Sequence, residues 1–167
     1  MIEGKDILDA CCGSRMFWFD KKRADVLYMD IRNGTHVEYT HENGTVSEWN
    51  ILPDIQGDFR KMPFDNESFS MVVFDPPHTV YGNPDSFINA KYGLLDKKSW
   101  KEDLRKGFTE CMRVLKDGGF LIFKWSECNI RISELKGIFP NRPMFGQKTN
   151  AKTMWLVFRK DTERVIA

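Results

Sequence analysis

A carboxylate followed by two prolines and a histidine is the part of this sequence whose residue types most directly suggest chemistry. The tetrapeptide Asp75-Pro76-Pro77-His78 comes directly after the apolar run 71–74. Each proline restricts the residue before it to extended backbone, and a proline has no N–H group. We therefore expect the Asp75 carboxylate and the Pro76 carbonyl to form a fixed pair of hydrogen-bond acceptors. Such a pair can hold a planar amino or amide group and orient its nitrogen for attack.

The surroundings of the tetrapeptide support this interpretation. The apolar run before it is typical of a buried strand, and open α/β sheets bind ligands beyond the carboxyl ends of their strands. His78 would offer a flat ring for stacking on a substrate, or it would relay a proton. A turn that merely ends a strand uses the same residue types, and in that case His78 is structural.

Composition places the chain among ordinary globular proteins. Its 167 residues fit one domain, expected to span residues 1–167, and 41% are hydrophobic and 29% charged. The net charge of +1 gives no overall signal for nucleic acid, so contact with a polyanion needs a local patch. We see neither an apolar stretch of about 20 residues nor a secretory signal, which favours a cytoplasmic protein with no membrane partner. The cysteines are not spaced as a zinc site, so we expect reduced thiols and no metal.

The pattern along the chain predicts strands alternating with helices. The predicted strands cover 5–10, 25–29, 55–58, 71–74 and 120–125, the predicted helices 14–22, 100–115 and 130–138, and a closing antiparallel pair 143–145 and 153–158. His41-Glu42-Asn43-Gly44 predicts a hairpin turn between strands 37–40 and 45–49. Ser99 and Glu102 are typical of a capping box at the start of the long helix, and residues 79–98 of a loop.

These elements predict a fold class. Strand, helix and strand in succession form a parallel βαβ unit. We therefore expect one doubly wound, Rossmann-like α/β domain, whose sheet is mostly parallel with an antiparallel strand near the C-terminus. A small β-hairpin is inserted after the second strand.

The motifs, in their order along the chain, resemble those of class I S-adenosylmethionine-dependent methyltransferases. The segment 7–14 resembles the first-strand glycine loop that wraps the cofactor. Asp30, with Ile31 beside it, closes the second strand where this fold binds the ribose hydroxyls, and Gly57-Asp58-Phe59 resembles the segment at the adenine. The tetrapeptide 75–78 resembles the catalytic motif of amino methyltransferases, and 113–120 resembles the turn into the fifth strand.

The resemblance implies a set of site residues and a cofactor, S-adenosylmethionine. The implied catalytic residues are Asp75, Pro76, Pro77 and His78. The implied cofactor-binding residues are Asp9, Ala10, Cys11, Cys12, Gly13, Ser14, Arg15, Asp30, Ile31, Asp58, Phe59 and Asp75. Arg15 stands where the loop usually has a second glycine, and it could reach the cofactor carboxylate. A nicotinamide-binding domain is the main rival, but only Gly13 stands where such a loop needs three glycines.

The resemblance also implies a substrate class. Motifs of this type, in small bacterial and phage forms, belong to enzymes that methylate planar nitrogens, so we expect adenine N6 in DNA or RNA first. The segment 91–106 holds six basic and three acidic residues, which could track phosphates or form a solvated helix face. No target-recognition domain fits, so a protein partner could supply recognition. The alternatives are a methyltransferase for a small molecule or a protein glutamine, and a non-catalytic cofactor-binding subunit.

Overall fold

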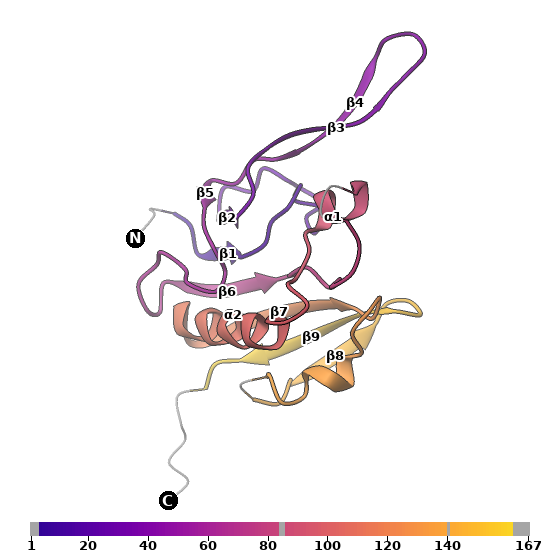
Figure 1. The fold of residues 1–167 in the computed structure, drawn as a ribbon. Helices are drawn as coiled ribbons and strands as arrows, with labels where there is room; N and C mark the ends of the chain where they lie inside the picture. The colour runs from indigo at the N-terminus through magenta and orange to yellow at the C-terminus, as the bar shows by residue number, and fades with distance from the viewer. Residues whose placement is uncertain (1–3, 84–85, 140, 162–167) are drawn as a thin grey trace, which may run out of the picture.

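A seven-stranded sheet forms the centre of the molecule (Figure 1). A computed structural model describes residues 4–83, 86–139 and 141–161. The strands in spatial order are β5 (Ile55–Gln56), β2 (Val26–Asp30), β1 (Ile7–Asp9), β6 (Phe69–Phe74), β7 (Leu115–Ser126), β9 (Thr153–Arg159) and β8 (Phe145–Lys148). The first five are parallel, and β9 is antiparallel to both of its neighbours. This confirms the predicted Rossmann-like, mostly parallel sheet with an antiparallel strand near its C-terminal end.

The order of the strands reverses between β1 and β6. From β1 the chain moves outward to β2 and β5, and it then returns to β6 on the other side of β1. Open α/β sheets bind ligands beyond the carboxyl ends of the strands at such a switch point. Asp9 ends β1 opposite Val73 of β6, two residues before Asp75. The topology therefore brings the ends of the two strands with predicted site residues to one place.

The predicted hairpin is confirmed and is longer than expected. Strands β3 (Gly34–Thr40) and β4 (Val46–Ile51) pair with each other outside the main sheet and project from it as an arm (Figure 1). The N–H of Gly44 donates to the His41 carbonyl over 2.9 Å. Gly44 has a φ of 81°, a left-handed conformation that glycine adopts without steric cost. The Asn-Gly turn is therefore the local cause of the hairpin.

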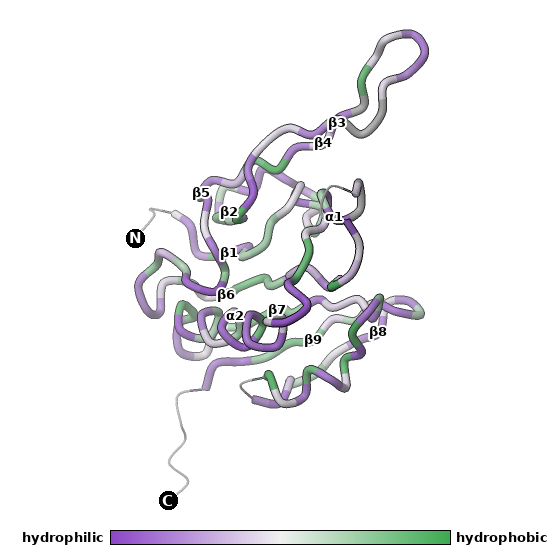
Figure 2. Tube along the Cα trace, in the orientation of Figure 1, coloured by the Kyte–Doolittle hydropathy of each residue, from purple (hydrophilic) through white to green (hydrophobic). Residues whose placement is uncertain are grey.

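Helix α2 (Trp100–Val114) covers one face of the sheet, against β6 and β7. Its predicted stripe is confirmed, because Leu104, Phe108 and Cys111 are fully buried. The ring centroids of Phe108 and Phe123 on β7 lie 4.8 Å apart. Figure 2 shows hydrophobic and hydrophilic residues mixed along α2, as an amphipathic helix requires.

The start of α2 differs from the predicted capping box, which is wrong. The Ser99 hydroxyl makes no cap hydrogen bond and instead donates to the Asp103 carboxylate over 2.7 Å. Asp96 supplies the acceptor, since its carboxylate accepts the N–H groups of Lys98 and Ser99. Glu102 is paired with Arg105 on the helix surface. Asp96 therefore fixes the turn that leads into α2, and no side chain among the described residues caps the first turn of the helix itself.

The predicted helix over 14–22 does not form. The segment makes a series of turns, and Arg15 has a φ of 57°, which interrupts a right-handed helix. Trp18 Nε1 donates to the Asp9 carboxylate over 2.8 Å, and the Phe17 ring lies 4.6 Å from that of Trp155 on β9. Aromatic side chains on turns therefore lie against the sheet face opposite α2.

Three further boundaries differ from expectation. The region 79–98 contains a short helix, α1 (Phe87–Tyr92), and 130–138 contains only a four-residue 3₁₀ helix, η1 (Ile132–Leu135). Strand β7 begins at Leu115, directly after α2, instead of at residue 120. Gly118, with a φ of 75°, lets the chain pass from helix to strand without a separate loop. None of the helices in the described part of the chain has the length and apolar character needed to cross a membrane.

Candidate active site

Two neighbouring cavities open at the carboxyl ends of β1, β2 and β6. The motif cavity, about 240 Å³, is lined by Asp9, Cys11, Cys12, Gly13, Ser14, Asp75, Pro76, Pro77 and His78 among others. The Asp30 cavity, about 340 Å³, is lined by Ala10, Cys11, Asp30, Ile31, Asp58 and Phe59 among others. Cys11, Arg32 and Pro77 line both. The structure thus gathers every sequence-predicted site residue except Arg15 around two adjoining hollows.

Asp75 is paired with a lysine that the sequence did not single out. Lys124 Nζ donates to Asp75 Oδ2 over 2.5 Å, and both side chains line the motif cavity. The exposed fractions are 31% for the Lys124 side chain and 24% for that of Asp75. Lys124 comes from β7, the neighbour of β6, which explains how residues 49 positions apart meet.

His78 lies at the wall of the motif cavity and is uncharged at neutral pH. Burial lowers the pKa of His78, the nearby Asp75 charge opposes this, and the Lys124 charge adds to it. The His78 ring meets the edge of Trp125, with ring centroids 6.2 Å apart. A neutral, packed imidazole is suited to stacking, and it can carry a proton only as a minor form.

Asp9 is a buried acid facing the same cavity. It accepts a hydrogen bond from Trp18 Nε1 over 2.8 Å. Burial raises the pKa of Asp9 to about 7, and the charges of Asp75 and Asp30 act in the same direction, whereas the Trp18 hydrogen bond opposes them. Near neutral pH both the protonated and the ionised form of Asp9 are therefore populated.

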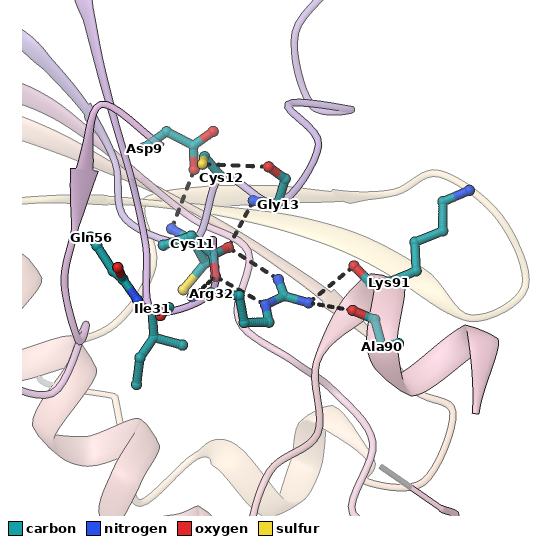
Figure 3. A network of polar contacts seen from close by, with 10 residues as sticks. Asp9, Cys11, Cys12, Gly13, Ile31, Arg32, Gln56, Ala90 and Lys91 are labelled. Carbon is teal, nitrogen blue, oxygen red and sulfur yellow. Dashed lines mark hydrogen bonds and ion pairs between the residues drawn. The ribbon is translucent and has the colours of Figure 1, made fainter. Parts of the chain in front are cut away.

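Asp30 accepts hydrogen bonds from Gly13 and Arg32, two residues that are labelled in the polar network of Figure 3. The Gly13 N–H donates to Asp30 Oδ2 over 2.9 Å, and the Arg32 guanidinium binds both oxygens over 3.0 Å. The same guanidinium donates to the carbonyls of Ala90 and Lys91 at the end of α1. Arg32 thus joins the end of β2 to the segment that follows the tetrapeptide 75–78 (Figure 3).

Asp58 is held by an arginine in the same way. Arg60 makes hydrogen bonds to both carboxylate oxygens of Asp58 and reaches Asp103 on α2 over 3.2 Å. Although burial acts to raise it, these hydrogen bonds lower the pKa of Asp58. Phe59 turns inward and packs on Phe74, with ring centroids 5.3 Å apart. The segment 57–59 therefore presents an ionised carboxylate beside an apolar wall.

Arg15 lies away from both cavities. Its guanidinium donates to the Leu52 carbonyl and the Asp54 carboxylate, and it lies 3.7 Å from the centre of the Tyr28 ring. Its third hydrogen bond goes to the Lys21 carbonyl. This position makes Arg15 a brace for the turns of the 14–22 segment.

The segment after the tetrapeptide is built around Asn89 and Gly93. The Asn89 amide is buried and donates to the carbonyls of Tyr81 and Asn83. Gly93 ends α1 with a φ of 83°, and a Cβ atom there would lie 2.6 Å from Pro77. Glycine is therefore required where this segment crosses the catalytic motif.

The cysteines and acids of the site offer neither a nucleophilic thiol nor a metal centre. Burial raises the pKa of Cys11 and of Cys12, so both thiols stay protonated at neutral pH. In residues 4–83, 86–139 and 141–161, no three His, Cys, Asp or Glu side chains come together as a metal ion would need.

Sequence reasoning missed three cations of the site, which are Arg32, Arg60 and Lys124. Two of them had a readable signal, because Asp30-Ile31-Arg32 and Asp58-Phe59-Arg60 share one pattern of acid, apolar residue and arginine. In both, the arginine folds back on the acid two positions before it. Lys124 carries a weaker signal, as a lone charge in the apolar run 120–125.

The chain was also compared with known proteins. No protein-family model and no curated protein matches the sequence. Solved structures do match. A SAM-dependent methyltransferase from Methanosarcina mazei has a TM-score of 0.56 and 14% identity over 97% of this chain and 95% of its own. The N-methyltransferase NodS from Bradyrhizobium japonicum has a TM-score of 0.50 and 12% identity over 95% and 86%.

A third match carries another activity on the same fold. The [4+2]-cyclase SpnF has a TM-score of 0.53 and 10% identity over 97% of this chain and 77% of its own. Likenesses at such identities establish the fold, which is that of class I methyltransferases. Because the fold hosts more than one activity, function has to be argued from the site.

Proposed function

We propose that this chain binds S-adenosylmethionine and transfers its methyl group to a planar nitrogen, with adenine N6 in DNA or RNA as the leading target. One observation carries the proposal. The acid and prolines of the catalytic motif and the loop 11–14 line the same cavity, at the switch point of the sheet. An acceptor for the substrate and a loop for the cofactor thus face each other there.

The two cavities fit the proposed cofactor in their chemistry. The Asp30 cavity combines apolar walls from Ile31, Phe59 and Leu95 with four aspartates, two of which are Asp30 and Asp58, and this combination suits an adenosine. Asp30 would bind the ribose hydroxyls and Asp58 the adenine amino group. Both acids already hold arginines, so the ligand shares them with Arg32 and Arg60. The motif cavity adjoins through Cys11 and Pro77 and would take the methionine end.

The chemistry follows from the acceptors at residues 75 and 76. S-adenosylmethionine, when bound, supplies an electrophilic methyl group. Asp75 and the Pro76 carbonyl hold the hydrogens of the acceptor nitrogen, so that its lone pair points at the methyl carbon. The lone pair forms the new N–C bond while the C–S bond breaks and its electron pair goes to sulfur. The nitrogen then loses one proton to Asp75 or water, and His78 stacks on the substrate ring.

Nucleic acid is the proposed polymer on the basis of local charge. Lys91 and Lys124 line the motif cavity, and the α2 region beyond carries Lys97, Lys98 and Lys101. Lys97 lies over the Tyr81 ring at 4.8 Å, a pairing that can contact both phosphate and base. A target base in a duplex would first leave the stack. A protein partner for target recognition remains part of the proposal.

A smaller substrate with the same planar nitrogen, including a glutamine side chain, is the second candidate. The observation in its favour is charge. The hairpin arm 34–51 carries three glutamates and neither lysine nor arginine, so it does not suit a phosphate backbone. In this case the basic residues at the cavity mouth serve a single anionic group.

The test is a methyl-transfer assay with labelled cofactor against separate DNA, RNA, protein and metabolite pools. We expect label in DNA or RNA, in N6-methyladenine after digestion. Label confined to protein or metabolites contradicts the nucleic-acid target. Tight cofactor binding by calorimetry without transfer to any pool supports the non-catalytic subunit instead. The absence of cofactor binding contradicts the whole proposal.

A further inference from the structure

We propose that Lys124 is a specificity-determining residue, which together with Asp75 selects substrates whose planar amino group adjoins a hydrogen-bond acceptor. The inference rests on the proposed methyl transfer and deepens it by naming the substrate class. That class comprises amino-bearing nucleobases and primary amides, and it leaves out aliphatic amines.

The position of Lys124 on its strand is the first observation. Leu121, Phe123 and Trp125 of β7 are fully buried on the sheet face under α2. Lys124 alternates with them and therefore lies on the opposite face. It stands near the carboxyl end of β7, where its ammonium reaches the carboxylate after β6. A lysine that follows the apolar run 120–123 of β7 thus lies at the wall of the motif cavity.

The second observation is the set of hydrogen-bond donors and acceptors of Lys124 and Asp75 that their mutual bond does not use. Lys124 has three N–H donors, and among the described residues its hydrogen-bonding partner is Asp75 alone. Asp75 uses Oδ2 in this bond, and its Oδ1 accepts none from the described part of the protein. The cavity wall therefore presents a carboxylate oxygen and ammonium N–H groups side by side.

Stability gives no sufficient reason for this pair. About a third of the Lys124 side chain and a quarter of the Asp75 side chain are exposed, and pairs of this kind contribute little to folding. A second pair on the same strand, Lys116 with Asp6 at 2.6 Å, meets the same structural need far from the cavity. Recognition accounts for Lys124, since both partners line the cavity and keep bonding capacity toward it.

A neighbouring donor and acceptor match one edge of a planar nitrogen compound. In adenine, N6 is flanked by the ring acceptors N1 and N7, in cytosine N4 adjoins N3, and in a primary amide the nitrogen adjoins the carbonyl oxygen. Asp75 accepts the amino hydrogen, and Lys124 donates to the neighbouring acceptor. An aliphatic amine has no such acceptor, and at neutral pH it is protonated and repelled by the ammonium.

The experiment pairs a change in the protein with a change in the substrate. Full-length wild type and Lys124→Met are assayed with S-adenosylmethionine on mixed-sequence oligonucleotides that contain adenine, 1-deazaadenine or 7-deazaadenine. For wild type we expect kcat/KM to fall about 10- to 100-fold with one of the two analogues. For Lys124→Met we expect a similar loss with adenine and no further loss with that analogue.

Controls separate recognition from folding. Lys116→Met removes the other lysine–aspartate pair of β7 and should behave as wild type. Lys124→Arg keeps a donor and should keep the discrimination between adenine and the analogue, whatever its stability. The inference is overturned if Lys124→Met retains the full analogue penalty, or if wild type methylates a polyamine as readily as planar nitrogens. Transfer to glutamine peptides instead of adenine contradicts the adenine target. On that substrate Lys124→Met should then lower kcat/KM about 10- to 100-fold while Lys116→Met does not, and an unchanged kcat/KM in Lys124→Met overturns the inference.

Discussion

Similar lysine–aspartate ion pairs lie at the two ends of the sheet, but the residues around them differ. Lys116 pairs with Asp6 at one end of β7, and Lys124 pairs with Asp75 at the other. Beside Asp6 lies a cavity of about 690 Å³, larger than either cavity of the candidate site. It is lined by residues of strand starts and turns, four of which are charged, whereas the lining of the motif cavity includes a proline pair, a histidine and a buried acid. Neither an ion pair nor cavity size identifies a site.

The difference follows from chain direction. In parallel strands the carboxyl ends of β1, β2 and β6 face one edge of the sheet, and the chain separates there at the switch point. Asp6 precedes β1 and Asp9 ends it, just as Asp25 precedes β2 and Asp30 ends it. Each of these two strands therefore has an acid just before its first residue that we expect to take no part in binding or catalysis. A variant of that acid is the control for the acid at the carboxyl end of the same strand.

The largest expected effect is on methyl transfer. Asp75→Ala should lower the transfer rate about 1000-fold or more, because the nitrogen loses its acceptor, and should change the cofactor dissociation constant less than about threefold. Asp6→Ala should leave both quantities unchanged. Transfer rates on the accepting pool and calorimetric titration measure the two. Activity retained in Asp75→Ala would remove the catalytic assignment.

The next effect is on cofactor affinity. Asp30→Asn should weaken S-adenosylmethionine binding about 10- to 100-fold, because a charged acceptor for the ribose hydroxyls is lost. Asp25→Asn, at the other end of β2 and paired with Arg23, should bind as wild type does. Equal affinities for the two variants in a calorimetric titration would show that Asp30 serves the fold through Arg32 instead.

The smallest effect is on the pH dependence of stability, and it has opposite signs at the two ends of β1. The pKa of Asp9 is raised to about 7 in the folded protein from 3.8. The folded state then binds a proton that the unfolded chain has lost, so this contribution to the free energy of unfolding falls as pH rises from about 4 to 7. In Asp9→Asn the free energy of unfolding should fall less than in wild type between pH 4 and 7, and the difference should be about 1 to 3 kcal/mol.

Asp6 provides the contrast. The hydrogen bond from Lys116, followed by that from Ser70, lowers the pKa of Asp6. Its contribution is present above pH 3.8 and is lost on acidification, so Asp6→Asn should leave the fall between pH 4 and 7 intact. Urea unfolding at several pH values measures both variants. An identical pH slope for wild type and Asp9→Asn would contradict the raised pKa of Asp9.

The sequence predicted the sheet well because its signals are local. Apolar runs marked the strands, and His41-Glu42-Asn43-Gly44 marked the hairpin. Asp75 could be placed at the end of a buried strand from the apolar run before it, whereas Asp30 was assigned through the resemblance to methyltransferases. The helix over 14–22 was wrong because the side chains of Arg15 and Trp18 bond to Asp54 and Asp9, and such partners cannot be read from periodicity.

The contacts of the site's cations could not be predicted from residues that are close in the sequence. Arg32 and Arg60 reach across 58 and 43 residues to α1 and α2, although each first binds an acid two positions away. Lys124 meets Asp75 only because β6 and β7 are neighbours in the sheet. Strand order is a tertiary property, so this pair could not be predicted before the topology was known.

The bridge made by Arg32 has a consequence for the sequence of binding events. The guanidinium that neutralises Asp30 also holds the carbonyls that end α1. A ligand hydroxyl that competes with Arg32 for Asp30 would weaken the hydrogen bonds between Arg32 and the end of α1. A substrate that moves the α1 segment would in turn change the hydrogen bonds between Arg32 and Asp30. The two binding events thus share one free energy of coupling, which must be equal in both directions. The expected signature is a change in the cofactor dissociation constant when the substrate is present, matched by the same factor in the dissociation constant of the substrate.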